Sequence, residues 1–156
     1  MSHPGLVIDS VRFAYEGGSV AGSIPCSTLA RLAERLDRIE GTIEFLVRGS
    51  VEDGKPFLTL EASGVLFLRC QRCLSEASHA VDLRSRLMLI QPSAPWPEDE
   101  MLEDSFDAIP ADPALDVVSL VEDEVMLALP ISPRHEACAA PNREQRGGDA
   151  SPFASL

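Results

Sequence analysis

Two pairs of metal-binding side chains recur at the same short spacing in this sequence. Cys70 and Cys73 form a Cys-x-x-Cys pair, and His135 and Cys138 form a His-x-x-Cys pair after 61 intervening residues. Two ligands separated by two residues can fold over one ion in a tight turn, and three thiolates with one imidazole complete a tetrahedral shell for Zn²⁺. One interpretation of the spacing is therefore a Cys₃His zinc site that pins the chain after the last predicted helix to a β-hairpin.

The Cys-x-x-Cys pair has two other interpretations, which the sequence leaves open. Both cysteines are compatible with reduced structural or surface thiols. A thiol oxidoreductase carries such a pair at a helix N-terminus within a βαβ unit, where the thiol pKa falls. Here an apolar stretch typical of a strand precedes the pair and another such stretch follows it. Cys26 has no paired neighbour and is expected to be buried, and His79 is expected in the core.

Arrangements typical of enzymes are missing from the sequence. It contains no phosphate-binding Gly-x-x-x-x-Gly-Lys loop, no dinucleotide fingerprint and no nucleophile elbow. Glu122, Asp123 and Glu124 cluster carboxylates, but neighbours along a helix point in different directions and do not form a facing acid–base pair, so we expect all three on a solvated helix face. The sequence therefore predicts a protein that is not an enzyme.

Acidic residues are concentrated in the second part of the chain. The 156 residues carry a formal charge of −12, and residues 91–156, with three basic and fourteen acidic residues, supply −11 of it. Such a surface repels phosphate and attracts basic proteins by electrostatic steering. One interpretation is a solvated acidic surface that keeps the protein soluble; the other is a docking surface for a basic partner, of which ribosomal proteins and basic segments of nucleic-acid enzymes are the plentiful cytoplasmic examples. The candidate docking residues are Glu98, Asp99, Glu100, Glu103, Asp104, Glu122, Asp123 and Glu124.

Arginines in the nearly neutral first part of the chain suggest an alternative, direct contact with RNA. Arg69 precedes the cysteine pair, Arg72 lies within it, and Arg84 and Arg86 lie on the polar face of the next predicted strand. Aromatic residues make up only 5% of the chain, so no stacking platform for single-stranded RNA is indicated. The alternative function is therefore a zinc-stabilised RNA-binding module that uses these four arginines.

The length and hydropathy of the chain indicate one cytoplasmic domain. A chain of 156 residues is typical of a single domain. No stretch approaches the roughly 18–20 apolar residues that a membrane span needs. The first five residues lack the charged and apolar regions of a secretory signal. We therefore expect a cytoplasmic protein without membrane contact.

The elements that position these residues are predicted from periodicity. One short strand is expected within the first 25 residues. Leucines at helical spacing after Ser27, ending at Ile39, predict an amphipathic helix of about 12 residues. Period-two alternation then predicts four strands between residues 42 and 89. We expect turns at Asp53-Gly54, in a connection longer than two residues, and at Ser63-Gly64.

The remaining chain is predicted to form an acidic loop, a second helix and a tail. The Pro-rich loop spans residues 91–111, and the helix begins at Pro113 with Asp112 as its N-cap. Its apolar stripe, from Ala114 through Val118, Val121, Val125 and Leu129, would cover the sheet. The predicted fold is α+β: an antiparallel meander of about four to six strands covered by two helices. A single domain would occupy residues 1–138, and residues 139–156 would form a flexible C-terminal tail.

Three segments stand in a family-specific order: the Cys-x-x-Cys segment 68–73, the helix and its continuation through His135 (120–135), and the Pro-Phe segment 151–156. Together they resemble the large ribosomal RNA subunit accumulation proteins, the YceD family. The resemblance implies a bacterial cytoplasmic protein needed for normal levels of large-subunit (23S) ribosomal RNA, acting in its synthesis, processing or stability. It implies no established catalytic activity or catalytic residues. The sequence thus favours a non-catalytic ribosome-biogenesis factor that docks a basic partner.

Overall fold

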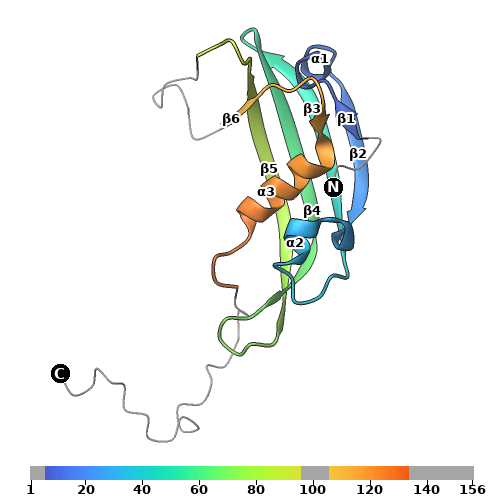
Figure 1. Cartoon of the computed structure of the whole chain (residues 1–156), viewed down its shortest axis with the longest axis vertical. Coiled ribbons are helices and arrows are strands. Elements are labelled where there is room, and N and C mark those ends of the chain that lie inside the picture. The colour runs from blue at the N-terminus through green and yellow to red at the C-terminus, as the bar shows by residue number, and fades with distance from the viewer. Residues whose placement is uncertain (1–5, 96–105, 134–156) are drawn as a thin grey trace, which may run out of the picture.

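A long five-stranded sheet forms the framework of the protein (Figure 1). The computed structural model describes residues 6–95 and 106–133. The strands lie in the order β2 (Ser19–Pro25), β3 (Thr42–Glu52), β4 (Lys55–Arg69), β5 (Glu76–Ile90) and β6 (Asp107–Pro110). Neighbouring strands are antiparallel except β5 and β6, which are parallel.

Helices cover one face of this sheet. They are α1 (Ser10–Tyr15), the single 3₁₀ turn η1 (Cys26–Thr28), α2 (Ala30–Ala33) and α3 (Val117–Ala128). A two-stranded ribbon of β1 (Val7–Ile8) and β7 (Leu115–Asp116) leads into α3. Figure 1 shows α3 lying across β4 and β5 with α2 beside it. The predicted α+β class, a mostly antiparallel sheet with helices on it, is confirmed.

The alternation of side chains along the strands explains why only one face is covered. Ile43, Phe45 and Val47 are buried under the helices, whereas the adjacent Thr42, Glu44 and Arg48 are exposed. The same pattern continues on β4 and β5, because successive side chains point to opposite faces of a strand. The main core therefore lies between the sheet and the helices. The opposite face is largely exposed, except at one end, where Phe57, Met88 and Ile90 form a second, smaller buried cluster with Phe106 and Ala108.

The N-terminal helices differ from the prediction. The sequence predicts a short strand from Leu6 and Ile8 to Val11-Arg12-Phe13, but only Val7–Ile8 is a strand. Val11 to Phe13 lie in the short helix α1, because Asp9 caps it by accepting a hydrogen bond from the Arg12 backbone N–H at 3.3 Å. The helix expected after Ser27 is shorter than predicted, with only four residues in α2, and Ile39 is 51% exposed instead of joining the core. The chain leaves the helix early because Asp37 donates its backbone N–H to the Phe67 carbonyl at 2.7 Å.

Two expected turns also come out differently. Asp53 and Gly54, at φ of 52° and 75°, form a two-residue connection rather than a longer one, since Glu52 pairs directly with Lys55. Both positive φ values are those of a type I′ hairpin turn. Ser63-Gly64 is not a turn: β4 runs straight through it as one strand of 15 residues. Position 64 has no room for a side chain, because a Cβ there would lie 2.6 Å from the Thr42 carbonyl oxygen.

The segment around α3 begins later than predicted. Asp116, not Asp112, is the N-cap, and its carboxylate accepts the backbone N–H groups of Val118 and Ser119 at 3.0 and 3.3 Å. Val118, Val121, Val125 and Leu129 of the predicted stripe are buried, whereas Ala114 is exposed. The end of the predicted acidic loop is ordered as β6. The expected flexible tail, residues 139–156, lies outside the described residues, and the expected domain limits stay a prediction.

Within the part of the chain that the structure describes, no helix combines the length and apolarity that crossing a membrane requires.

Replacing Gly64 by alanine is expected to destabilise the fold. The added methyl group would meet the Thr42 carbonyl at 2.6 Å and Ile43 Cδ1 at 3.0 Å, so β3 must shift. Overpacking of this kind costs about 1–3 kcal/mol in the free energy of unfolding. Urea denaturation measures this loss, and Ser63→Ala, at the exposed neighbouring position, serves as the control. Equal stability of the two variants would contradict the close approach.

Candidate functional site

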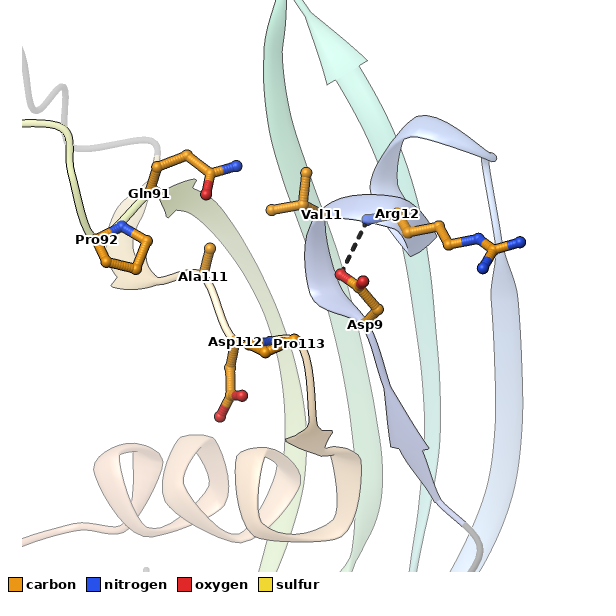
Figure 2. A pocket seen from close by; sticks show the side chains of 8 residues that line it. All are labelled: Asp9, Val11, Arg12, Gln91, Pro92, Ala111, Asp112 and Pro113. Atoms are coloured by element: carbon orange, nitrogen blue, oxygen red, sulfur yellow. Dashed lines mark hydrogen bonds between the residues drawn. The ribbon is translucent and has the colours of Figure 1, made fainter.

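A depression of about 430 Å³ lies where the predicted acidic loop joins the fold. Figure 2 shows Val11 facing Gln91, Pro92 and Ala111 across it. Asp9 and Asp112 also line it, and both are exposed. Three separate segments meet here: the start of α1, the end of β5 and the chain after β6. The depression therefore combines apolar walls with two carboxylates.

Backbone hydrogen bonds hold these walls in place. The fully buried Ser10 links two of them: its N–H donates to the Asp112 carbonyl at 3.0 Å, and its hydroxyl accepts the Asp112 N–H at 2.9 Å. The Ala111 N–H donates to the Ile90 carbonyl at 2.7 Å and closes the third wall. Because these bonds satisfy the backbone groups locally, the depression is a preformed feature of the fold.

The charge of the depression is negative. Among the described residues that line it, Arg12 is the only basic one, and its guanidinium pairs with Glu16 at 2.9 Å. The hydrogen bond that Arg12 donates to Glu16 raises the pKa of Arg12, and the charge of Glu16 adds to the effect. Asp9 and Asp112 each accept one backbone N–H. Carboxylates that stay exposed in this way can attract a cation.

Five of the predicted docking residues belong to the loop that starts and ends at this depression. The predicted loop, residues 91–111, begins with Gln91 and Pro92 and ends with Ala111, and all three residues line the depression. Glu98, Asp99, Glu100, Glu103 and Asp104 themselves lie outside the described residues. Sequence reasoning missed Asp9 and Asp112 as members of the same acidic region, because only the fold brings residue 9 next to residue 112.

The other three predicted docking residues lie on α3 and have partners within the chain. The expectation that all three are solvated is wrong for Glu122, which is only 7% exposed. Its carboxylate accepts the backbone N–H groups of Arg31 and Leu32 at 3.1 and 3.3 Å and the Arg31 guanidinium at 2.8 Å. Glu122 therefore stabilises the fold, and its carboxylate is too buried to contact a docking partner.

Asp123 and Glu124 are more accessible than Glu122. Asp123 forms an ion pair with Arg31 at 2.6 Å, and Glu124 accepts the Ser85 hydroxyl at 2.6 Å. The pKa of Arg31 is raised, most by its hydrogen bond to Asp123 and next by the one to Glu122. Asp123 is thus paired with a cation and Glu124 with a hydroxyl group, and both lie on α3, which does not line the depression.

Two of the four predicted RNA-contacting arginines are neutralised on the open face of the sheet. Arg84 lies 3.8 Å from Glu61 on the neighbouring strand, and Arg86 forms an ion pair with Glu52. The Arg86 guanidinium also stacks over the Phe57 ring at 5.0 Å. Arg69 and Arg72 are exposed at the opposite end of β4, and Arg69 Nε donates to the Leu74 carbonyl at 3.3 Å. The four arginines therefore fall into two separate pairs, one on the open face of the sheet and one at the turn between β4 and β5.

The Cys-x-x-Cys pair forms a tight turn between β4 and β5. Cys70 is buried and Cys73 is exposed. The Arg72 backbone N–H points to Cys70 Sγ at 3.4 Å, the Leu74 N–H donates to the Cys70 carbonyl at 2.9 Å, and Leu74 takes a φ of 64°. A strand follows the turn instead of a helix, so the geometry of a thioredoxin-like redox pair does not arise.

The chain approaching the second ligand pair is anchored at this turn. The Gln71 backbone N–H donates to the Pro133 carbonyl at 2.8 Å. His135 and Cys138 follow Pro133 closely in sequence but lie outside the described residues. Within residues 6–95 and 106–133, no three His, Cys, Asp or Glu side chains are grouped to hold a metal ion.

The two remaining residues of interest are partly or wholly in the interior. Cys26 is fully buried, as expected, and burial raises the pKa of its thiol. His79 is half-buried instead of belonging to the core, and it lines a cavity of about 240 Å³ between β5 and the chain after α3. Neither residue is grouped with other reactive side chains in the described part of the chain.

Comparison with known proteins points to one family. The family model described as large ribosomal RNA subunit accumulation protein YceD matches residues 58–152. The large ribosomal RNA subunit accumulation protein YceD of Haemophilus influenzae is 26% identical over 151 residues, which cover 90% of this chain and 82% of the relative. No solved structure gives a significant match.

Glu122→Ala is expected to destabilise the protein although the residue belongs to an acidic cluster. It leaves the buried Leu32 N–H without its acceptor, a loss of about 1–3 kcal/mol. Asp123→Ala, at the neighbouring exposed position, is the control and should change stability little. Thermal unfolding followed by circular dichroism compares the two. A melting temperature unaffected by Glu122→Ala would show that the carboxylate does not support the fold.

Proposed function

Because the chain belongs to the YceD family of large ribosomal RNA subunit accumulation proteins, we propose that it is a non-catalytic factor in the synthesis, processing or stability of large-subunit ribosomal RNA that docks a basic protein partner. The description of the family names ribosomal RNA accumulation and no reaction. The docking surface, called the acidic surface below, comprises the depression with Asp9 and Asp112 and the five carboxylates of the loop, Glu98, Asp99, Glu100, Glu103 and Asp104.

The observation that carries this proposal is the coincidence of the depression with both ends of the carboxylate-rich loop. Residues from Glu98 to Asp104 include five acids and no Lys or Arg. The depression at their base has apolar walls and two further carboxylates. A basic segment has long aliphatic stems and charged ends, so it matches both properties. Opposite potentials of this kind speed encounter and select against acidic or nucleic-acid partners.

The partner proposed for this surface is a basic protein of the ribosome or of its assembly machinery, encountered in the cytoplasm. In this arrangement the effect on ribosomal RNA is indirect, because the acidic surface itself repels phosphate. The contacts of Glu122 support a docking site away from α3. Glu122 holds α2 on α3, so the loop and the depression are left to bind the basic partner.

Neutralising the loop is expected to weaken docking and to lower the amount of large-subunit ribosomal RNA. The variant carries Glu98→Gln, Asp99→Asn, Glu100→Gln, Glu103→Gln and Asp104→Asn. Its association rate with purified basic large-subunit proteins should fall about tenfold or more at low salt, the usual scale of electrostatic steering. Surface plasmon resonance measures this rate. The ratio of large- to small-subunit ribosomal RNA is measured in cells that depend on the variant.

The matched control removes five exposed carboxylates that lie away from the end of β5 where the loop begins, Glu34, Asp37, Glu40, Glu44 and Asp82, by the same amide substitutions. It changes the net charge equally but leaves the acidic surface intact. Equal association rates and equal RNA ratios for the two variants would remove the docking proposal.

A second candidate function, a zinc-stabilised RNA-binding module, is favoured by the turn at the cysteine pair. The Arg72 backbone N–H donates to Cys70 Sγ, as backbone N–H groups do to metal-bound sulfur. The positive φ of Leu74 reverses the chain direction directly after the cysteine pair. The anchor of Pro133 at Gln71 brings the chain that continues to His135 and Cys138 to the same end of the sheet. In this candidate Cys70, Cys73, His135 and Cys138 hold Zn²⁺, and Arg69 and Arg72 contact RNA.

Metal content separates the two candidates. If the module exists, the full chain purified with zinc in the medium carries one zinc per chain, and Cys70→Ser and Cys138→Ser lose it. Cys26→Ser is the matched control, because Cys26 is buried away from the turn and should leave the metal content unchanged. Elemental analysis by mass spectrometry measures the ratio, and a zinc-free wild-type chain would exclude the module.

A further inference from the structure

The two edges of the five-stranded sheet are protected to very different degrees. At one edge β6 is only four residues long, ends at Pro110 and is flanked by the acidic loop. At the other edge β2 has seven residues, Ser-Val-Ala-Gly-Ser-Ile-Pro, and none of them is charged. Figure 1 places the two strands on opposite sides of the sheet. Natural sheets normally protect such an edge with charges, bulges or a covering segment.

The register of β2 against β3 shows which backbone groups face outward. The Gly49 N–H donates to the Gly18 carbonyl at 2.8 Å, and the Cys26 N–H donates to the Gly41 carbonyl at 3.0 Å. The register is continuous between these two points. Since the backbone groups of successive residues alternate in direction in an antiparallel pair, the even-numbered residues of β2 bond to β3. The N–H and C=O groups of Ser19, Ala21 and Ser23 therefore point away from the sheet.

The surroundings of these outward groups are open. Ser19, Ala21 and Ser23 are exposed, and among the described residues no other strand pairs with β2 besides β3. Their side chains are small, so another backbone can approach to the normal strand spacing of about 4.8 Å. No charged residue occurs from Gly17 to Ala30. The edge is thus a row of unsatisfied donors and acceptors with neither bulk nor charge to repel a neighbour.

We propose that β2 pairs with β2 of a second copy of this chain and joins the two sheets into one of ten strands. An antiparallel pair centred on Ala21 places Ala21 opposite Ala21 and Ser19 opposite Ser23. Each outward N–H then faces an outward C=O, so the edge is complementary to itself. Such an interface is small, and a weak, concentration-dependent dimer is expected because interfaces below about 1,200 Å² belong to transient complexes.

Charge favours a second copy over a basic partner at this edge. The edge offers no carboxylate to a basic segment, whereas neutral edges of two copies meet without repulsion. The carboxylate-rich loop starts after β5, with β3 and β4 between that strand and β2. Three strand spacings of about 4.8 Å exceed the screening length of about 8 Å at physiological salt. Pairing through β2 therefore keeps the points where the two loops begin apart by more than the screening length.

The test places like charges at the centre of the pair. Ala21→Lys sets two lysines opposite each other, which opposes pairing, and should raise the dimer dissociation constant about tenfold or more. Ala21→Glu should do the same, and an equimolar mixture of the two variants should restore association through opposite charges. Ala80→Lys is the matched control, because Ala80 is an exposed alanine on the open face of β5. Sedimentation velocity measures association at protein concentrations up to about 1 mM, the range of weak complexes.

A second measurement uses the unaltered chain. Amide hydrogen exchange at Ser19, Ala21 and Ser23 should slow as the protein concentration rises, while exchange at Arg48 on β3 should not change. A monomer at every concentration, or a dimer that Ala21→Lys does not weaken, would overturn the proposal. Because the carboxylate-rich loop begins after β5, three strand spacings from β2, Ala21→Lys leaves the association rate with basic proteins unchanged, so failure of this proposal is distinguishable from failure of docking.

Discussion

The carboxylate of Glu122 is the contact on which the helical layer depends. α2 has only four residues, too few to be stable alone. Its N-cap position is Leu29, whose side chain has no group to accept the first helical N–H bonds. Glu122, ninety residues later, accepts the N–H groups of Arg31 and Leu32. A helix that lacks a cap in its own sequence is therefore capped by a neighbouring helix, and one interaction holds both α2 and α3 over the sheet.

Local physical chemistry explains which parts of the fold the sequence predicts. Alternation identifies β3, β4 and β5, because their covered and open faces differ sharply in polarity. The first residue of a helix is harder to predict, because more than one residue can serve as its N-cap. Asp112 and Asp116 both precede apolar residues, and Asp116 is the N-cap because β7 pairs with β1 up to that residue. The Ser63-Gly64 pair has the composition of a turn, but packing against Thr42 decides its role.

The functional region is predictable where it depends on local spacing and unpredictable where distant segments meet. The cysteine spacing predicts a tight turn, and the structure has one. The acidic loop is visible in the composition. The depression at its base is not, because it needs Ser10 to bond Asp112 across 102 positions. Likewise, the ion pairs of Arg84 and Arg86 depend on cross-strand register, which residue counts alone do not reveal.

The parallel pairing of β5 with β6 has a consequence for the loop between them. Antiparallel neighbours can be joined by two residues, as at Asp53-Gly54, but parallel neighbours need a connection of about a dozen residues or more. The sixteen residues between Ile90 and Asp107 therefore satisfy a topological requirement first. The sheet topology fixes the length of this loop but not its residue types, so carboxylates can accumulate there by mutation at little cost to the stability of the fold. A binding surface for a partner can therefore evolve on a loop that the sheet topology requires in any case.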